Sequence, residues 1–255
     1  MIRVGVLGAA GRMGRHVCRA VSFAGDLELV AAVDTKAKGD VDGVELQTSV
    51  EALGAAGAEV AVDFTRPGAA RENVRWCLEN GVHAVVGTTG ISPDVLEELR
   101  VLADGGPANA FVAPNFAVGA VLMMRFAEQA ARHLDAAEVI ELYHDAKADA
   151  PSGTAIATAR RIAAAREGAW IAPHGDEAFP GARGVDVDGV RIHAVRLPGL
   201  LAHQQVVFGG VGETLSIRHD STDRASFMPG VLMAVRAVGR LPGLTVGLDT
   251  LLDER

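Results

Sequence analysis

The chain has 255 residues, of which 49% are hydrophobic and 22% charged, a balance that is ordinary for a globular protein with a buried core. Its 24 Lys and Arg residues are outnumbered by 32 Asp and Glu residues, which gives a net charge of −8. A field of that sign argues against nucleic acid or an anionic membrane as the main partner, and an anionic substrate would need a locally positive pocket.

The first 115 residues alternate predicted strands with predicted helices. Short apolar runs rich in β-branched residues predict strands at Ile2–Leu7, Leu27–Asp34, Glu59–Thr65, His83–Thr88 and Ala110–Ala113. Helices are predicted between them, from the glycines after the first strand to about Phe23, near Gly68–Asn80 and near Asp94–Ala103. Such an alternation is typical of a parallel sheet covered on both faces. We therefore predict a Rossmann-like, doubly wound α/β domain.

The pattern changes after Pro114–Asn115, where we expect a smaller α+β domain. A long amphipathic helix is predicted at Val118–Leu134, with one apolar stripe formed by Val118, Leu122, Phe126 and Ala130. The elements predicted after it are a strand at Glu138–His144, a helix at Ser152–Arg166, strands at Gly189–Leu197, His203–Gly209 and Glu213–His219, and a helix at Val231–Val238. The last three strands indicate a mainly antiparallel sheet, one face of which often builds an oligomer contact. Leu244–Leu248 is expected to return to the first domain.

A glycine-rich loop follows the first strand and leads into the first helix. Its residues are Gly8, Ala9, Ala10, Gly11, Arg12, Met13 and Gly14, with the spacing G-x-x-G-x-x-G in place of the commoner G-x-G-x-x-G. Small residues let the backbone approach a pyrophosphate that rests on the helix N-terminus. Asp34 ends the second strand 20 residues after Gly14, where an acid can bind the adenosine ribose. The loop and the acid together predict a dinucleotide site.

The charges around Asp34 bear on the choice of cofactor. The Asp34 carboxylate favours NADH, because it repels a 2′-phosphate. Arg12, Lys36 and Lys38 are close enough in sequence to compensate that phosphate, although the two lysines fit equally well as solvated loop charges. We expect both NADH and NADPH to serve as cofactors.

The densest polar cluster of the chain is the segment Glu141–Ala155, with the sequence ELYHDAKADAPSGTA. Pro151 marks the entry to a helix, and Ser152–Thr154 then present a cap and N–H groups that can hold a substrate carboxylate. Lys147 can supply a positive charge or a proton, and His144 a donor that titrates near neutrality. Taken singly, Ser152–Thr154 is also typical of an ordinary helix cap and His144 of a structural histidine.

At these residues the chain resembles the 4-hydroxy-tetrahydrodipicolinate reductases (dihydrodipicolinate reductases) of lysine and diaminopimelate biosynthesis. The resemblance runs nearly end to end, and the segment from Glu141 to Thr154 is its most specific part. The other matching motifs are the glycine-rich loop, Asp63–Thr65, Gly87–Gly90, Ala113–Phe116, Gly212–Glu213 and Arg218–Ser221. The region from Ala182–Gly184 to Arg196–Leu197 is similar to the actinobacterial branch of the family.

The resemblance implies a role for each motif. The nicotinamide would lie against Gly87, Thr88, Thr89, Ala113, Pro114, Asn115 and Phe116. The two carboxylates of the cyclic substrate would be held by His144, Lys147, Ser152, Gly153 and Thr154, with Lys147 also a proton donor. The resemblance also implies a homotetramer whose second domains associate through their sheets. The dinucleotide-binding domain would comprise residues 1–116 and 225–255, and the substrate-binding and tetramerisation domain residues 117–224.

One position departs from the family pattern. The family carries two consecutive histidines before the lysine, of which the first is its usual proton donor, and here that position is Tyr143. A phenol is a weaker acid than an imidazolium near neutrality, although a nearby ammonium such as that of Lys147 strengthens it. Tyr143 and Lys147 are therefore the candidate catalytic residues, with water as a third source of the proton.

Three other functions compete with this one. Tyr143 and Lys147 also have the Tyr-x-x-x-Lys spacing of short-chain dehydrogenases, but that family needs an upstream serine, and no Ser or Thr occurs between Ser92 and Ser152. A reductase of the same fold that acts on another carboxylated cyclic imine would account for Tyr143. A non-catalytic dinucleotide sensor would account for the lost histidine but not for the retained His144 and Lys147.

The sequence also indicates a cellular setting. It shows neither a secretory leader nor an apolar run of the roughly 18 residues that a membrane span needs. Cys18 and Cys77 lie in helix-like segments and fit buried thiols in a reducing compartment. We expect a cytoplasmic protein without a structural disulfide, a metal site or a membrane span.

Overall fold

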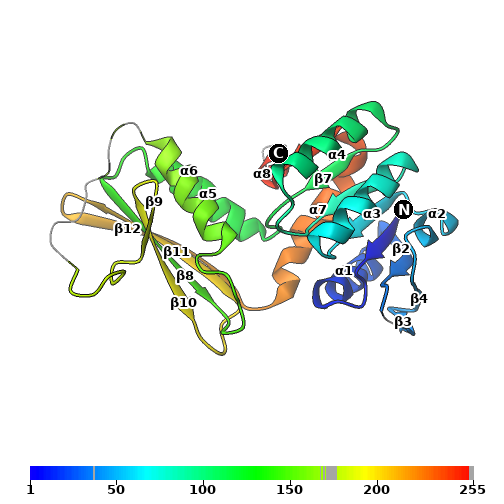
Figure 1. Ribbon diagram of the computed structural model, residues 1–255, viewed down its shortest axis with the longest axis horizontal. Helices are drawn as coiled ribbons and strands as arrows, with labels where there is room; N and C mark the ends of the chain where they lie inside the picture. Colours follow the sequence, from blue (N-terminus) through cyan, green and yellow to red (C-terminus); the bar gives the residue numbers. More distant parts are fainter. Residues whose placement is uncertain (37, 167, 169, 171–176, 253–255) are drawn as a thin grey trace. The chain divides into compact units, whose positions relative to one another are not determined.

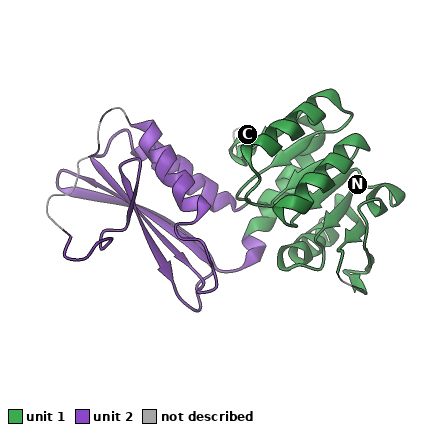
Figure 2. Cartoon of the chain, viewed as in Figure 1, with its two compact units in different colours: residues 1–116, 227–255 green, residues 117–226 purple. Residues whose placement is uncertain are grey.

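The computed structural model describes residues 1–36, 38–166, 168, 170 and 177–252. These residues form two compact units, coloured separately in Figure 2. Unit 1 contains residues 1–116 and the described residues from 227 onward, and unit 2 contains residues 117–226. Within the described ranges, no helix is both long enough and apolar enough to cross a membrane.

Unit 1 is built on one eight-stranded sheet (Figure 1). In spatial order its strands are β13 (Leu244–Val246), β7 (Ala110–Val112), β6 (His83–Val86), β5 (Val60–Asp63), β1 (Ile2–Leu7), β2 (Leu27–Val33), β4 (Val44–Gln47) and β3 (Asp40–Val41). All neighbouring strands pair in parallel except β3 and β4. This arrangement confirms the predicted doubly wound α/β fold, and β13 confirms that the tail returns to the first sheet.

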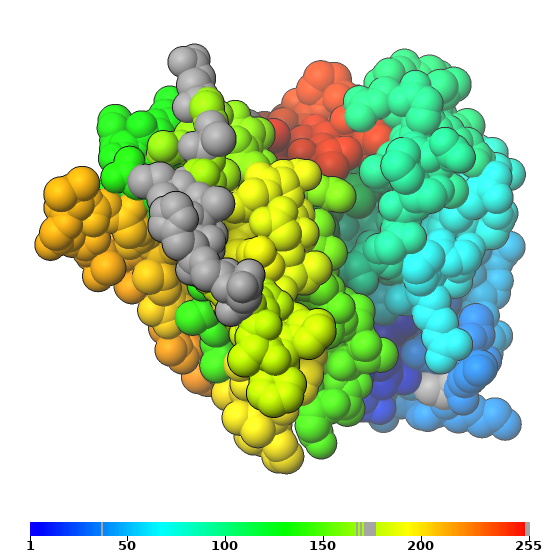
Figure 3. Space-filling view, turned by 60° about the vertical axis from the view of Figure 1, so that its left-hand side comes forward, coloured from blue at the N-terminus to red at the C-terminus, as the bar shows by residue number. Residues whose placement is uncertain are grey.

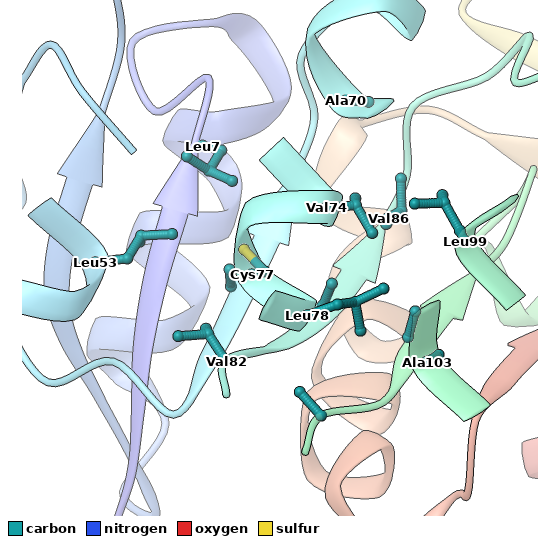
Figure 4. Packing of buried hydrophobic residues seen from close by; sticks show 14 of the residues in the cluster. Leu7, Leu53, Ala70, Val74, Cys77, Leu78, Val82, Val86, Leu99 and Ala103 are labelled. Carbon is teal, nitrogen blue, oxygen red and sulfur yellow. The ribbon is translucent and has the colours of Figure 1, made fainter. Parts of the chain in front are cut away.

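Helices cover both faces of the unit 1 sheet, because right-handed crossovers that leave β1 in opposite directions must pass over opposite faces. The helices are α1 (Arg12–Phe23), α2 (Ala52–Ala55), α3 (Pro67–Glu79), α4 (Pro93–Gly105), α7 (Met228–Ala237) and α8 (Asp249–Leu252), with a 3₁₀ turn at Val238–Arg240. A second 3₁₀ turn, Arg224–Phe227, lies where the chain passes from unit 2 back to unit 1. Helix α1 packs with α7, and α3 packs with α4. The cluster in Figure 4 includes Leu7 and Val86 from the sheet and Val74, Leu78 and Leu99 from α3 and α4, all buried. Cys77 is buried in the same cluster as a free thiol.

The carboxyl ends of the unit 1 strands meet at one edge of the sheet. In the parallel register, Leu7 lies beside both Val33 and Asp63, and Asp63 lies beside Val86, which lies beside Val112. The residues that follow each strand therefore share this edge, where ligands of open α/β sheets bind.

Unit 2 is a five-stranded sheet with two helices on it (Figure 1). In spatial order its strands are β12 (Glu213–Ser221), β11 (Ala202–Gly210), β8 (Ala136–Tyr143), β10 (Val190–Arg196) and β9 (Val185–Val187). Helices α5 (Val118–Ala130) and α6 (Gly153–Ala165) pack with each other and on the strands. The sheet is mainly antiparallel, as predicted, but β10 and β8 pair in parallel. Edge strand β12, orange in Figure 3, is exposed along most of its length.

The predicted apolar stripe of α5 is wrong. The buried residues of this helix are Ala120, Val121, Met123, Met124 and Ala127, whereas Phe126 is 51% exposed, and the helix ends at Ala130 rather than Leu134. The stretch is apolar almost all round, so its sequence allows more than one stripe. Packing on α6 and the sheet therefore decides which face is buried, and the buried face combines alanines with Met123 and Met124.

The structure also contains two hairpins that the hydrophobic pattern does not predict. Asp42 and Gly43 join β3 to β4, and Asp188 and Gly189 join β9 to β10, with positive φ at all four residues (48°, 81°, 52° and 87°). An Asp-Gly pair in a two-residue loop is typical of a type I′ hairpin turn. The two Asp-Gly dipeptides therefore indicate these hairpins, although the strands that they join are short.

Candidate active site

The glycine-rich loop of unit 1 joins β1 to α1 in a tight turn. Gly8 has a φ of +77°, which strongly favours glycine, and its N–H donates to the Val33 carbonyl at 2.8 Å. A Cβ atom on Gly14 would lie 2.0 Å from the Gly8 carbonyl oxygen, so this position also requires glycine. Gly11, which precedes α1, has no side chain to cap the helix. The first turn of α1 therefore offers N–H groups and a positive dipole end to an anion.

Asp34 follows β2 at the same edge of the sheet. Its N–H donates to the Gln47 carbonyl at 2.8 Å, and one carboxylate oxygen accepts the Lys36 N–H at 3.1 Å. The carboxylate is partly buried, whereas the side chains of Arg12, Lys36 and Lys38 are exposed. Strand β4 thus fixes the backbone of Asp34, and the turn to Lys36 orients its carboxylate.

A buried carboxylate supports the neighbouring turn at Gly87–Thr89. Asp63, at the end of β5, is 1% exposed and accepts hydrogen bonds from four donors. They are the N–H (2.8 Å) and hydroxyl (2.7 Å) of Thr65, the hydroxyl of Thr88 (3.0 Å) and the amide of Asn73 (2.8 Å). Sequence reasoning noted Asp63 only as part of a motif and gave it no role.

The aromatic rings of Phe64 and Phe116 pack together at the same edge of the sheet. A Cβ atom on Gly87 would lie 2.2 Å from the Phe64 ring, so the turn and the ring are in close contact. The ring centroid of Phe116 lies 6.0 Å from that of Phe64 and 6.2 Å from that of Phe111, and Phe116 is 2% exposed. Of the residues predicted to line a nicotinamide, Phe116 can therefore offer only its backbone.

The polar segment of unit 2 runs from the end of β8 to the start of α6. Glu141 is fully buried, and its two carboxylate oxygens lie 3.1 and 2.9 Å from the Ser152 nitrogen, whose N–H they accept. The Ser152 hydroxyl accepts the Ala155 N–H at 3.1 Å and is thereby used as the cap of α6. Gly153, which is exposed, and Thr154 occupy the first turn, where N–H groups have no intrahelical acceptor. This end of α6 can therefore hold a carboxylate.

Tyr143, at the end of β8, lies next to two cations. The Lys147 Nζ atom lies 4.8 Å from the centre of the Tyr143 ring, and the Arg196 Cζ atom lies 5.4 Å from it. The Lys147 ammonium also donates to Asp149 Oδ1 at 2.7 Å. This hydrogen bond, with smaller help from Arg196, lowers the pKa of Asp149 below its ordinary value. The segment thus combines a phenol, an ammonium and a carboxylate.

The predicted site residues therefore form two groups, one in each unit. The glycine-rich loop, Asp34 and the Gly87–Thr89 turn share one sheet edge, and Tyr143, Lys147 and the start of α6 share one segment. His144 is half-buried, and its carbonyl accepts the Lys147 N–H at 3.2 Å. The sequence motifs give no role to Arg196. This residue lies beside Tyr143 because β10 pairs with β8.

Comparison with known proteins covers both units. A family model described as dihydrodipicolinate reductase, N-terminus, matches residues 2–116, and one described as dihydrodipicolinate reductase, C-terminus, matches residues 119–252. A 4-hydroxy-tetrahydrodipicolinate reductase of Nocardia farcinica is 57% identical to the chain over 256 residues, covering 99% of each. One of Streptomyces griseus is 52% identical, covering 99% of this chain and 98% of the relative.

Solved structures extend this comparison to the fold. A dipicolinate-bound dihydrodipicolinate reductase from Paenisporosarcina sp. TG-14 superposes with a TM-score of 0.88 at 40% identity, covering 98% of this chain and 99% of that one. An amine dehydrogenase from Mycobacterium smegmatis has a TM-score of 0.66 at 17% identity, covering 97% of this chain and 95% of that one. The second likeness shows a shared fold only.

Proposed function

The chain belongs to the dihydrodipicolinate reductase family, and we propose that it reduces 4-hydroxy-tetrahydrodipicolinate to tetrahydrodipicolinate in lysine and diaminopimelate biosynthesis. Members of this family are oxidoreductases that use a nicotinamide dinucleotide. The observation that carries the proposal is the segment from Glu141 to Thr154, in which the Lys147 ammonium lies beside the Tyr143 ring and the first turn of α6 presents the N–H groups of Gly153 and Thr154.

Unit 1 fits the dinucleotide. A pyrophosphate and a ribose at this edge are supported by the glycine-rich loop, the uncapped start of α1 and the Asp34 carboxylate. When bound, the reduced nicotinamide supplies the hydride of the reaction. We assign the loop from Gly8 to Met13, Asp34 and Lys36 to the adenosine and phosphate end. The Gly87–Thr89 turn and the backbone from Ala113 to Phe116 are assigned to the nicotinamide end.

Unit 2 fits the dicarboxylate. One carboxylate is held by the N–H groups of Gly153 and Thr154 with the Thr154 hydroxyl, and the other by Lys147 and His144. Buried Ser152 contributes as the cap that fixes this first turn. The 2.7 Å hydrogen bond to Asp149 occupies one of the three donors of the Lys147 ammonium, which leaves two for the substrate carboxylate.

Proton transfer is assigned to Tyr143 and Lys147. The reduction requires one proton besides the hydride, and the 4-hydroxyl group leaves as water. The Tyr143 hydroxyl is the donor in this scheme, and the Lys147 ammonium beside the ring stabilises the negative charge that forms on the phenol. Tyr143 therefore takes the place of the family's first histidine.

The sheet of unit 2 supports the proposed homotetramer. Val139, Val206 and Ile192 point toward α5 and α6, so the alternate residues Ile140 and Val207 lie on the opposite face, where they are half-buried. The same face also carries the polar side chains of Glu138, His193 and Gln205, and a face that mixes apolar and polar side chains is typical of a subunit contact. A mass in solution of four times the 26.4-kDa protomer would support the tetramer, and a monomer mass would contradict it.

Turnover at saturating NADH tests the proposed function. NADH oxidation should depend on 4-hydroxy-tetrahydrodipicolinate and be at least tenfold faster than with a monocarboxylated cyclic imine, because the second carboxylate adds a charged hydrogen bond worth about 1.5–3 kcal/mol. Faster turnover of the monocarboxylate would indicate a different imine as substrate. Tight NADH binding without turnover of either compound would indicate a dinucleotide sensor.

A further inference from the structure

Arg196 lies at the end of β10, on the strand beside β8, and its side chain is 17% exposed. Its Nη2 atom donates to Glu141 Oε1 at 2.7 Å and to the Asp149 carbonyl at 2.6 Å. Its guanidinium also lies beside the Tyr143 ring, with Cζ 5.4 Å from the ring centre. One arginine thus touches three parts of the polar segment.

Glu141 completes the arrangement from the other side. Its carboxylate has no solvent exposure and accepts the Ser152 N–H while it pairs with Arg196. The loop from Asp149 to Ser152 is therefore tied at its first residue by Arg196 and at its last by Glu141. Because Asp149 holds Lys147 and Ser152 caps α6, both proposed carboxylate-binding groups depend on this loop.

We propose that Arg196, paired with Glu141, is a positioning residue that holds the Tyr143 ring, the Lys147 ammonium and the start of α6 in one arrangement before the dicarboxylate binds. This inference rests on the proposed function. Arg196 acts through its neighbours, whereas Lys147 and the start of α6 meet the substrate themselves.

The ion pair is poorly explained as a device for stability alone. Burying a carboxylate costs hydration energy that its ion pair often fails to regain, and apolar residues could fill the same space. A hydrogen-bonded pair that fixes one loop geometry instead meets a requirement of catalysis, because a misplacement of about 1 Å in a site can cost about 10²-fold in rate.

The chain offers a direct probe of this arrangement. Tyr143 is its only tyrosine, so labelling with ζ-¹³C tyrosine gives one NMR resonance, which reports on the Tyr143 hydroxyl carbon. The resonance is followed in the full-length protein without ligand and during titration with dipicolinate, which serves as the dicarboxylate probe. NADH binding is measured in parallel as a property of unit 1.

The main variant is the double substitution Glu141→Gln with Arg196→Met. The Glu141→Gln change avoids a buried unpaired charge, and the remaining amide oxygen can still accept the Ser152 N–H in place of the two carboxylate oxygens, so the main loss is that of the guanidinium contacts. Arg196→Lys keeps the charge but cannot reproduce the planar fork over the ring. Arg161→Met is the matched control, because Arg161 is partly exposed and pairs with Glu128 between α5 and α6 of the same unit.

We expect the double variant to shift the Tyr143 resonance and to weaken dipicolinate binding by about 10²-fold, with NADH affinity unchanged. KM for the substrate should rise and kcat should fall, whereas a partly unfolded population would lower kcat at constant KM. Arg196→Lys should recover part of the affinity, and Arg161→Met should match the parent in every measurement. A double variant with the parent's resonance position and dipicolinate affinity would overturn the inference. A parent protein that binds neither dipicolinate nor the substrate would instead overturn the proposed function.

Discussion

Replacing Tyr143 with phenylalanine removes the proposed proton donor and keeps the ring. The ring contacts with the Lys147 Nζ atom at 4.8 Å and the Arg196 Cζ atom at 5.4 Å do not involve the hydroxyl. Cation–π contacts of this kind are worth about 0.5–2 kcal/mol, and Phe forms them as Tyr does. We therefore expect the folded structure and the Lys147 position to survive the substitution.

The expected loss in rate follows from the chemistry. General acid catalysis contributes about 10²–10⁴-fold, and a phenol should lie near the lower end because it is a weaker acid than imidazolium. A loss of 10²-fold corresponds to about 2.7 kcal/mol in the barrier, which exceeds any difference in ring packing. A fall in kcat of this size, with KM nearly unchanged, would therefore report the hydroxyl itself.

Steady-state kinetics with 4-hydroxy-tetrahydrodipicolinate and NADH measure this loss, and Tyr143→His is the matched comparison. The histidine variant restores the family pattern and should equal or exceed the parent in kcat. Full activity of Tyr143→Phe would refute the assignment, because the proton would then come from Lys147 or water. A histidine variant that gains nothing would favour a different imine as substrate.

Three further predictions concern other parts of the molecule. Asp34→Ala should weaken NADH binding more than NADPH binding, because only the unphosphorylated ribose gains from the carboxylate; an equal loss in both dissociation constants would make Asp34 structural. Lys147→Ala and Thr154→Ala should each raise KM for the dicarboxylate by roughly ten- to hundredfold and leave NADH affinity intact, since a charged hydrogen bond is worth about 1.5–3 kcal/mol. Unchanged kinetics in both variants would contradict the proposed carboxylate-binding site. Burial lowers the pKa of His83 below its ordinary 6.5, and its Nδ1 accepts the Asn109 N–H, so the neutral form is favoured in the folded state. The stability that His83 contributes is present above pH 6.5 and is lost as the pH falls through 6.5 toward the lower pKa of the folded state. Over this range, the free energy of unfolding in urea should decline less steeply in His83→Gln than in the parent. An identical decline would contradict the lowered pKa of His83.

Much of the fold could be predicted because its signals are local. Buried parallel strands are continuous apolar runs, so β1 was predicted at its observed bounds, and the Ser152–Gly153 start of α6 carries its own cap. Helix α5 was harder, because an almost uniformly apolar stretch does not specify which stripe is buried. The parallel pairing of β10 with β8 depends on where a long connection places the strand, which no local pattern encodes.

The supporting residues of the candidate site were beyond the reach of local patterns. Asp63 meets Thr88 from 25 positions away, and Arg196 meets Glu141 from 55 positions away. Their sequence surroundings are those of ordinary strand ends, and their roles exist only once two strands lie side by side. Sequence motifs indicate the groups that we propose to meet ligands, whereas the groups that hold them are visible only in the structure.

Deuterium transfer from the cofactor to the substrate is the most direct test of the proposed reduction. The parent protein is mixed with 4-hydroxy-tetrahydrodipicolinate and NADH that carries deuterium at the transferable C4 position, and the product is analysed by mass spectrometry. We expect tetrahydrodipicolinate with one deuterium in its ring, formed in step with NADH oxidation. Oxidised cofactor with an unlabelled product, or bound substrate and cofactor with no oxidation, would contradict the proposed function.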